Sequence, residues 1–77
     1  MKTAREKRMR LRLLVAKRIR QIREEQWLSQ EGVAGIAELH RTYVSSVERG
    51  ERNITVDSLE RLADALDVDV RAFFEPE

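Results

Sequence analysis

The chain contains no cysteine among its 77 residues, so neither disulfides nor a zinc site built on thiolates can stabilise it. This absence leaves the redox compartment of the protein undetermined. A chain of this length supports one small domain, near the lower limit of what one core can hold without such supports. Stability must therefore come from a hydrophobic core or from an interface with a second copy, and we expect one dimeric domain.

Long apolar runs are also missing. No stretch approaches the roughly 18 apolar residues that span a bilayer, and the N-terminus lacks the apolar segment of a secretory signal. We therefore expect a cytoplasmic protein that has no membrane partner. Glycine occurs three times, proline occurs once, and no β-branched run marks a strand, so the predicted class is all-α.

The net charge is only +1, but the charges are distributed unevenly. Ten of the fifteen basic residues precede residue 24, where Glu6 alone opposes them, whereas seven acidic residues face two arginines beyond Asn53. Electrostatic attraction is screened over about 8 Å, so its effect is local. The N-terminal end is predicted to attract polyanions. We interpret residues 1–12 as a basic extension, or alternatively a solvated tail, and residues 13–77 as the domain.

Apolar residues at three- and four-residue steps predict a series of short helices. The predicted helices cover about residues 11–26, 29–37, 41–49, 55–66 and 69–75. Residues 8–13 alternate with a two-residue period instead, which indicates a strand or an extended arm. Ser29 and Thr55 are candidate N-caps, Gly50 is a natural left-handed terminator, and Pro76 ends the last helix. The residues predicted to face inward from the second and fourth helices are Val33, Ala34, Ala37, Leu59, Leu62, Ala63 and Leu66.

The segment from residue 39 to residue 53 is the most informative part of the chain. At about 100° per residue, Val44 and Val47 share one side of a helix. The residues that fan across the other side or stand at the helix start are Arg41, Thr42, Ser45, Ser46 and Arg49. Arginine can bind the two acceptors of guanine, and small hydroxyls can donate to or accept from either kind of base pair. The segment is therefore predicted to be a DNA-recognition helix.

The order of short motifs along the chain adds specificity to this interpretation. These motifs are Ile19-Arg20-Gln21-Ile22-Arg23-Glu24-Glu25, Leu28-Ser29-Gln30-Glu31, the block from Arg41 to Asn53, Leu59-Glu60-Arg61-Leu62-Ala63-Asp64-Ala65-Leu66, and Phe73-Phe74. Over roughly residues 14–74 this order resembles the Cro and phage-repressor helix-turn-helix family. The blocks at 40–45 and 48–53 are most similar to the controller proteins of restriction-modification systems.

The resemblance implies a compact five-helix, lambda-repressor-like domain that binds a near-palindromic DNA operator as a homodimer and activates or represses transcription. By resemblance, the base-reading residues are Arg41, Thr42, Ser45 and Ser46. The residues implied to make backbone or supporting contacts are Gln30, Tyr43, Arg49, Arg52 and Asn53. The implied dimer interface contains Val68, Val70, Phe73 and Phe74. Because the two phenylalanines diverge by about 100° on a helix, one of them is expected to face a partner chain.

The chain also departs from the family pattern. Trp27 and Glu38 stand where relatives usually have glycine, and a positive φ would strain either residue. Gly32 and Gly35 lie inside the second predicted helix, where each costs about 1 kcal/mol relative to alanine. These departures leave the docking of Gln30 open.

Two side chains are given structural roles. Glu48 points toward the core side of its helix, so we predict an ion pair with an arginine of the first helix, such as Arg18 or Arg20, that braces the recognition helix. Trp27 could be a stacking platform, but it is predicted to fill the space between the first two helices.

Catalysis, cofactors, metals and small-molecule substrates are not expected. His40 is the only histidine, stands where an N-cap belongs, and lacks partners for zinc binding or general-base chemistry. Asp57, Glu60 and Asp64 recur along one helix, but no nucleophile or glycine loop accompanies them, so a solvated face is predicted.

Three further hypotheses follow from the charge distribution. Residues 2–12 are predicted to act as a basic arm on operator phosphates. The alternative to a regulator is an antitoxin-like interaction module, in which the acidic C-terminal half and the pair Phe73-Phe74 bind a partner protein and DNA binding is secondary. A basic amphipathic helix on an anionic membrane would account for residues 8–23 alone.

Overall fold

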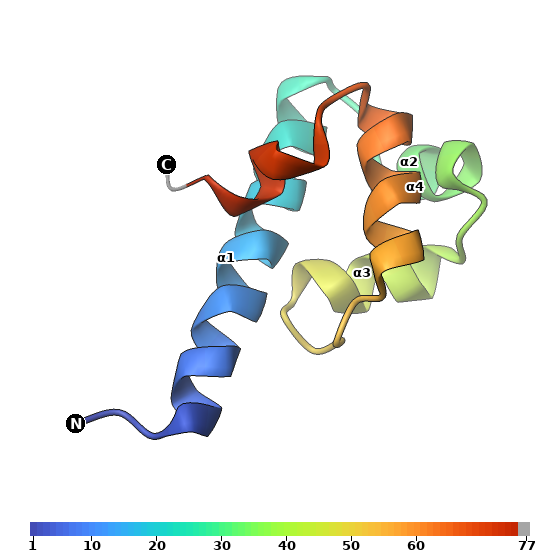
Figure 1. Cartoon of the computed structure of the whole chain (residues 1–77). Coiled ribbons are helices and arrows are strands. Elements are labelled where there is room, and N and C mark those ends of the chain that lie inside the picture. The colour runs from blue at the N-terminus through green and yellow to red at the C-terminus, as the bar shows by residue number, and fades with distance from the viewer. Residues whose placement is uncertain (76–77) are drawn as a thin grey trace.

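The structure is a computed structural model that describes the backbone of residues 1–75 and the side chains of residues 1–6 and 10–75. It contains α1 (Ala4–Glu25), α2 (Gln30–Ala37), α3 (Arg41–Glu48), α4 (Val56–Leu66) and the 3₁₀ helix η1 (Val70–Phe74) (Figure 1). No strand occurs in this part of the chain, which confirms the all-α class. The fifth predicted helix is a 3₁₀ helix, and the predicted role of Pro76 lies outside the described residues.

Side-chain caps start four of these helices. The hydroxyls of Thr3, Ser29 and Thr55 each accept a hydrogen bond from the backbone N–H three residues later, and the Asp69 carboxylate accepts from the N–H of residue 71. These bonds satisfy amide groups that have no partner within the helix. The predicted caps at Ser29 and Thr55 are confirmed.

The prediction of a strand or extended arm at residues 8–13 is wrong, because α1 is helical from Ala4 onward. Thr3 and Glu6 form a capping pair, in which the N–H of Glu6 donates to the Thr3 hydroxyl and that hydroxyl donates to the Glu6 carboxylate. Arginine, lysine and leucine all have high helix propensity, so helix is favoured here despite the two-residue alternation.

Four residues with positive φ turn the chain where a helix ends or just beyond. They are Trp27 (58°), Glu38 (58°), Asp67 (55°) and Gly50 (75°). Trp27 and Glu38, which stand where relatives usually have glycine, both have a positive φ. At Glu38 this conformation lets the N–H of Leu39 donate to the carbonyl of Ala34 at 2.9 Å, which closes α2 and points the chain toward α3.

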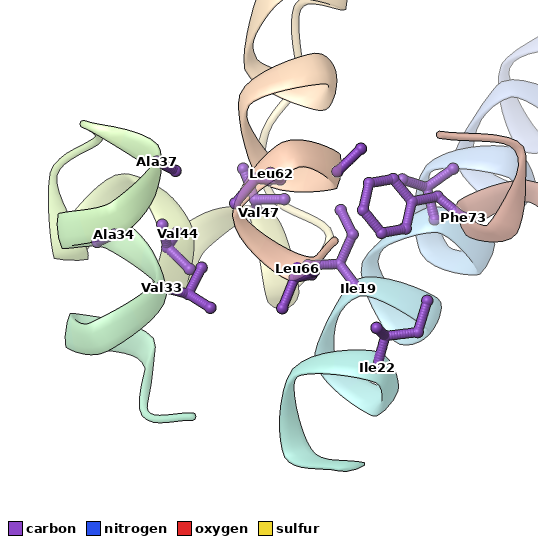
Figure 2. Close-up of a cluster of buried hydrophobic side chains, with 12 residues drawn as sticks. Ile19, Ile22, Val33, Ala34, Ala37, Val44, Val47, Leu62, Leu66 and Phe73 are labelled. Carbon is purple, nitrogen blue, oxygen red and sulfur yellow. The ribbon is translucent and has the colours of Figure 1, made fainter. Parts of the chain in front are cut away.

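One hydrophobic cluster joins all five helices (Figure 2). Its largest fully buried side chains are Phe73, Ile19, Leu62, Leu66, Val33 and Val44. Burying a side chain of this size stabilises the fold by about 1.5–3 kcal/mol. The inward positions predicted for α2 and α4 are confirmed, with Leu59 only partly buried at the edge of the cluster.

The two phenylalanines of η1 point in different directions, as predicted. Phe73 is completely buried and enters the cluster, whereas Phe74 keeps 41% of its surface exposed. The Nε of Arg18 on α1 donates to the carbonyl of Ala72 at 3.2 Å and holds η1 against α1.

The prediction that Trp27 fills the space between α1 and α2 is wrong, because this side chain is 94% exposed. Its positive φ places it on the turn after α1, and that space is closed instead by Leu28, which packs on the core. Within the described residues, no helix has the length and apolar character needed to cross a bilayer.

Candidate nucleic-acid interface

Two short helices, α2 and α3, are joined by the turn at residues 38–40 and form a helix-turn-helix. Val33, Ala34 and Ala37 of α2 are buried, as are Val44 and Val47 of α3, so the two helices present their apolar sides to the same core. The opposite side of α3 faces away from the core. This arrangement presents α3 to a partner while α2 supports it.

A buried ion pair fixes the end of α3. The Nε and Nη2 of Arg23 on α1 donate to the two carboxylate oxygens of Glu48 at 2.6 and 2.8 Å. Arg23 also donates to the carbonyl of Leu28 at 2.8 Å, and the Gln30 amide donates to Glu48 at 3.0 Å. The hydrogen-bonded pairing with Glu48 raises the pKa of Arg23 above its ordinary value, although burial acts in the opposite direction.

The predicted ion pair between Glu48 and an arginine of the first helix is confirmed, but the partner is Arg23 and neither of the two arginines named as examples. Arg18 bonds to residues 21 and 72, and Arg20 lies at 3.6 Å from Glu24 on the exposed side of α1. Arg23 lies four residues after Ile19, so it shares the core-facing side of α1 and reaches Glu48.

The outward side of α3 carries polar side chains with little attachment to the rest of the fold. Arg41 and Thr42 are exposed, and neither side chain makes a hydrogen bond or an ion pair with the described residues. Ser45 is partly exposed and accepts a hydrogen bond from Arg49, which also pairs with Glu51 at 3.0 Å. Two hydroxyls and two arginines thus lie on one accessible surface.

Ser46 is buried, whereas its predicted role in base reading requires an exposed side chain. The residue is 7% exposed, and its hydroxyl donates to the carbonyl of Tyr43 and accepts from the Nε of Arg52 at 3.1 Å. Because the side chain is buried and its hydroxyl already bonds within the fold, Ser46 is not assigned to base reading. It anchors the loop after α3 instead.

The loop between α3 and α4 brings further polar groups to the same end of the molecule. The guanidinium of Arg52 lies 5.6 Å from the centroid of the Tyr43 ring, within the range of a cation–π contact. Asn53 is exposed at the edge of a hollow that Ile54 helps to line. The structure therefore places Arg52 against Tyr43 and Ser46 of α3, whereas Asn53 lies beside residues of α1.

His40 is the N-cap residue of α3, as its position predicted, but its exposed side chain makes no capping bond. Among the described residues, no three histidine or acidic side chains are grouped closely enough to hold a metal ion.

The predicted dimer residues are divided between the surface and the core. Phe73 is buried inside its own chain, so it has no surface to offer a partner, and this prediction is corrected. Val70 and Phe74 are 38% and 41% exposed, and Val68 is partly buried. Two hollows of about 360 and 540 Å³ flank Phe74, and Leu59 lines both.

Sequence reasoning missed other members of this apolar surface. Leu11 is 52% exposed and lines the first hollow, and Val56 is 78% exposed and lines the second. Their exposure beside Phe74 becomes visible only when α1, α4 and η1 are placed together.

Nearby, hydrogen bonds from Arg71 lower the pKa of Asp69 to about 2.

The chain was compared with known proteins. The family model described as Helix-turn-helix matches residues 19–73. The control protein C.BamHI of Bacillus amyloliquefaciens is 46% identical over 59 residues, which cover 75% of this chain and 73% of that protein. The controller protein C.AhdI from Aeromonas hydrophila has a crystal structure with a TM-score of 0.80 and 40% identity, covering 82% of this chain and 96% of that chain.

A second controller, C.Esp1396I, has been solved as a tetramer in complex with its natural 35-base-pair operator. That chain has a TM-score of 0.78 and 41% identity, with 83% of this chain and 84% of that chain covered. Alanine variants of C.Esp1396I at a consecutive arginine, threonine and tyrosine have also been solved. The present chain belongs to the helix-turn-helix family of Cro and phage-repressor type, and it is a transcription regulator like the restriction-modification controller proteins.

Proposed function

We propose that this chain binds a near-palindromic DNA operator as a homodimer and regulates transcription by occupying it. The observation that carries the proposal is the division of α3 into two sides. Val44, Val47 and Glu48 are buried, while Arg41 and Thr42 are exposed and make no hydrogen bond or ion pair with the side chains and backbone that the structure describes. A recognition helix must hold a fixed position in the major groove. Its outward side chains must also be free, because they make the hydrogen bonds to the base edges.

Base reading is assigned to Arg41, Thr42 and Ser45. Arg41 stands at the start of α3, where the side chain can extend toward the groove floor and contact a guanine through two hydrogen bonds. The order Arg41-Thr42-Tyr43 repeats the residue types that were replaced in the C.Esp1396I variants, which supports this assignment.

Backbone contacts are assigned to Gln30, Tyr43, Arg49, Arg52 and Asn53. The Gln30 amide nitrogen uses one hydrogen on Glu48 and keeps a second that it can donate to a phosphate. Arg49 is held by exposed partners only, Ser45 and Glu51, which water or phosphate can replace. These contacts would set the register of the protein on the duplex without selecting its sequence.

The homodimer is assigned to the apolar surface around Phe74. A two-fold interface uses the same patch on both copies, so a suitable patch combines a protrusion with a depression. Phe74 between its two hollows has this form, because the ring of each copy can enter a hollow of the other. In such a dimer the two α3 helices would enter major grooves about 34 Å apart.

The proposal is tested by selecting bound sites from a random duplex library at near-physiological salt, with Arg41→Ala run in parallel. The natural chain should enrich an inverted repeat. Arg41→Ala should lose the base preference at one position of each half-site, a preference of about 1–3 kcal/mol in the natural chain. Arg61→Ala, which removes an exposed arginine from α4, is the matched control and should leave the repeat unchanged.

Two outcomes would refute this proposal. Uniform, salt-sensitive binding without any enriched sequence would reject operator recognition and favour a protein-interaction module. An enriched repeat whose base preference is the same in Arg41→Ala would reject the assignment of Arg41.

A further inference from the structure

The first turns of α1 form a helical extension, residues 4–13, for which the family match does not account. That match begins at residue 19. Figure 1 shows these turns projecting beyond the other elements, past the loop that connects α3 to α4. At 1.5 Å per residue, the ten residues of the extension form a rod about 15 Å long.

The base of the extension lies against the end of the candidate recognition helix. The Leu13 side chain packs closely against Gly50. A Cβ atom added to Gly50 would lie 2.6 Å from the Cδ2 atom of Leu13. Arg12 lines the same hollow as Asn53 of the following loop. The extension therefore leaves the domain beside the residues assigned to phosphate contacts.

One side of α1 changes character where the helix leaves the core. Arg5, Arg12 and Ile19 follow one another at seven-residue steps, so they lie on one stripe of the helix. Ile19 is completely buried, Arg12 is half-buried, and Arg5 is exposed. The side of α1 that is apolar in the core is therefore basic near the α3–α4 loop.

The extension carries a large excess of positive charge. The sequence places six basic residues among residues 1–12, and Glu6 is the sole acid there. The Glu6 carboxylate accepts from the Thr3 hydroxyl, and among the described side chains Arg5 and Arg10 have no ion-pair partner. A run of basic residues along one helix fits a polyanion with closely spaced charges.

We propose that this extension binds the phosphate backbone of the operator between its two half-sites. The inference rests on the proposed function, because it requires the dimer around Phe74. Leu11 and Arg12 line a hollow together with Phe74, so the base of the extension lies at the proposed two-fold interface. In a dimer the two extensions stand near the two-fold axis, over the centre of the operator, while the α3 helices lie to either side.

The test compares the salt dependence of operator binding for two double variants of the full-length chain. Arg5→Gln with Arg12→Gln removes the stripe, and Arg20→Gln with Arg61→Gln removes the same charge from exposed positions elsewhere. The slope of log affinity against log salt should fall by about 1.8 per chain in the stripe variant, at about 0.9 per lost phosphate contact. The control variant should keep the natural slope.

Footprinting locates the contact on the DNA. Hydroxyl-radical protection of the segment between the half-sites should disappear in the stripe variant, while protection of both half-sites remains. Because Arg12 adjoins the proposed interface, Arg5→Gln alone serves as a second variant that leaves the Phe74 hollow unaltered. It should show about half of the change in slope.

The outcomes separate this inference from the function on which it rests. If the natural chain selects an inverted repeat but the stripe variant keeps both the natural slope and the central protection, the extension does not bind DNA and the inference is overturned alone. If the natural chain selects no sequence, the proposed function fails first. Slope loss without loss of central protection would place the contact elsewhere and would also overturn the inference.

Discussion

Replacing Glu48 by glutamine removes one charge from the buried pair that fixes α3 to α1. Arg23 is 8% exposed, and the Glu48 side chain is 2% exposed, so water cannot compensate for the missing partner. Removing one member of such a pair costs about 3–5 kcal/mol. Glutamine still accepts one hydrogen bond, so we expect the lower end of that range, about 3 kcal/mol.

A loss of that size is a large part of the stability of a small domain. At about 0.05–0.15 kcal/mol per residue, a chain of 77 residues has a free energy of unfolding of about 4–12 kcal/mol. In domains of this size, each kcal/mol of lost unfolding free energy lowers the melting temperature by about 4–8 °C. The melting temperature of Glu48→Gln should therefore fall by at least about 12 °C. Far-UV circular dichroism during heating and in urea measures both quantities.

Two further variants make this prediction specific. Glu24→Gln breaks the exposed pair between Arg20 and Glu24 and should change stability by less than about 0.5 kcal/mol. Arg23→Met combined with Glu48→Leu replaces the buried pair by apolar side chains and should recover most of the loss. A stability of Glu48→Gln within about 0.5 kcal/mol of the natural chain would refute the brace.

Three further predictions concern other parts of the molecule. Gly50→Ala should lower the free energy of unfolding in urea by about 1–2 kcal/mol, because φ is positive there and Leu13 must move. Phe74→Ser should raise the dimer dissociation constant at least about tenfold in sedimentation equilibrium. Asp69 should titrate near pH 2 by NMR, and because its pKa is lowered, its stabilisation is present above the unfolded-state pKa and is lost as the pH falls toward 2.

Each of these predictions has a matched control. Gly35→Ala meets no atom within 4 Å and should stabilise the chain, so equal losses at both glycines would contradict the argument for residue 50. Trp27→Ser removes an aromatic side chain that is 94% exposed and should leave the dimer intact. Arg71→Gln should return the pKa of Asp69 toward its usual range, and an unaltered titration would exclude the guanidinium as the cause.

Most of the fold could be predicted because apolar spacing and cap residues act locally. Ser29, Thr55 and Gly50 are boundary signals that depend on a few neighbouring atoms. The start of α1 was missed because its two-residue alternation was given more weight than the capping pair of Thr3 and Glu6, which was readable in the sequence.

The site was less predictable because it depends on directions between elements. Arg23 carried a usable signal, since it stands four residues after Ile19 on the core side of α1. The engagement of Ser46 by Arg52 had no such signal, because it requires the path of the α3–α4 loop. The exposure of Trp27 likewise follows from a turn whose orientation only the folded chain defines.

The attachment of α3 has a practical consequence for building new regulators. Its fixed side depends on Val44, Val47 and Glu48, whereas the side chains of Arg41 and Thr42 make no hydrogen bond or ion pair with the described residues. A library randomised at those two outward positions should therefore consist mostly of members that fold like the parent. Variants with altered operator preference could then be selected without a separate search for compensating stabilising mutations.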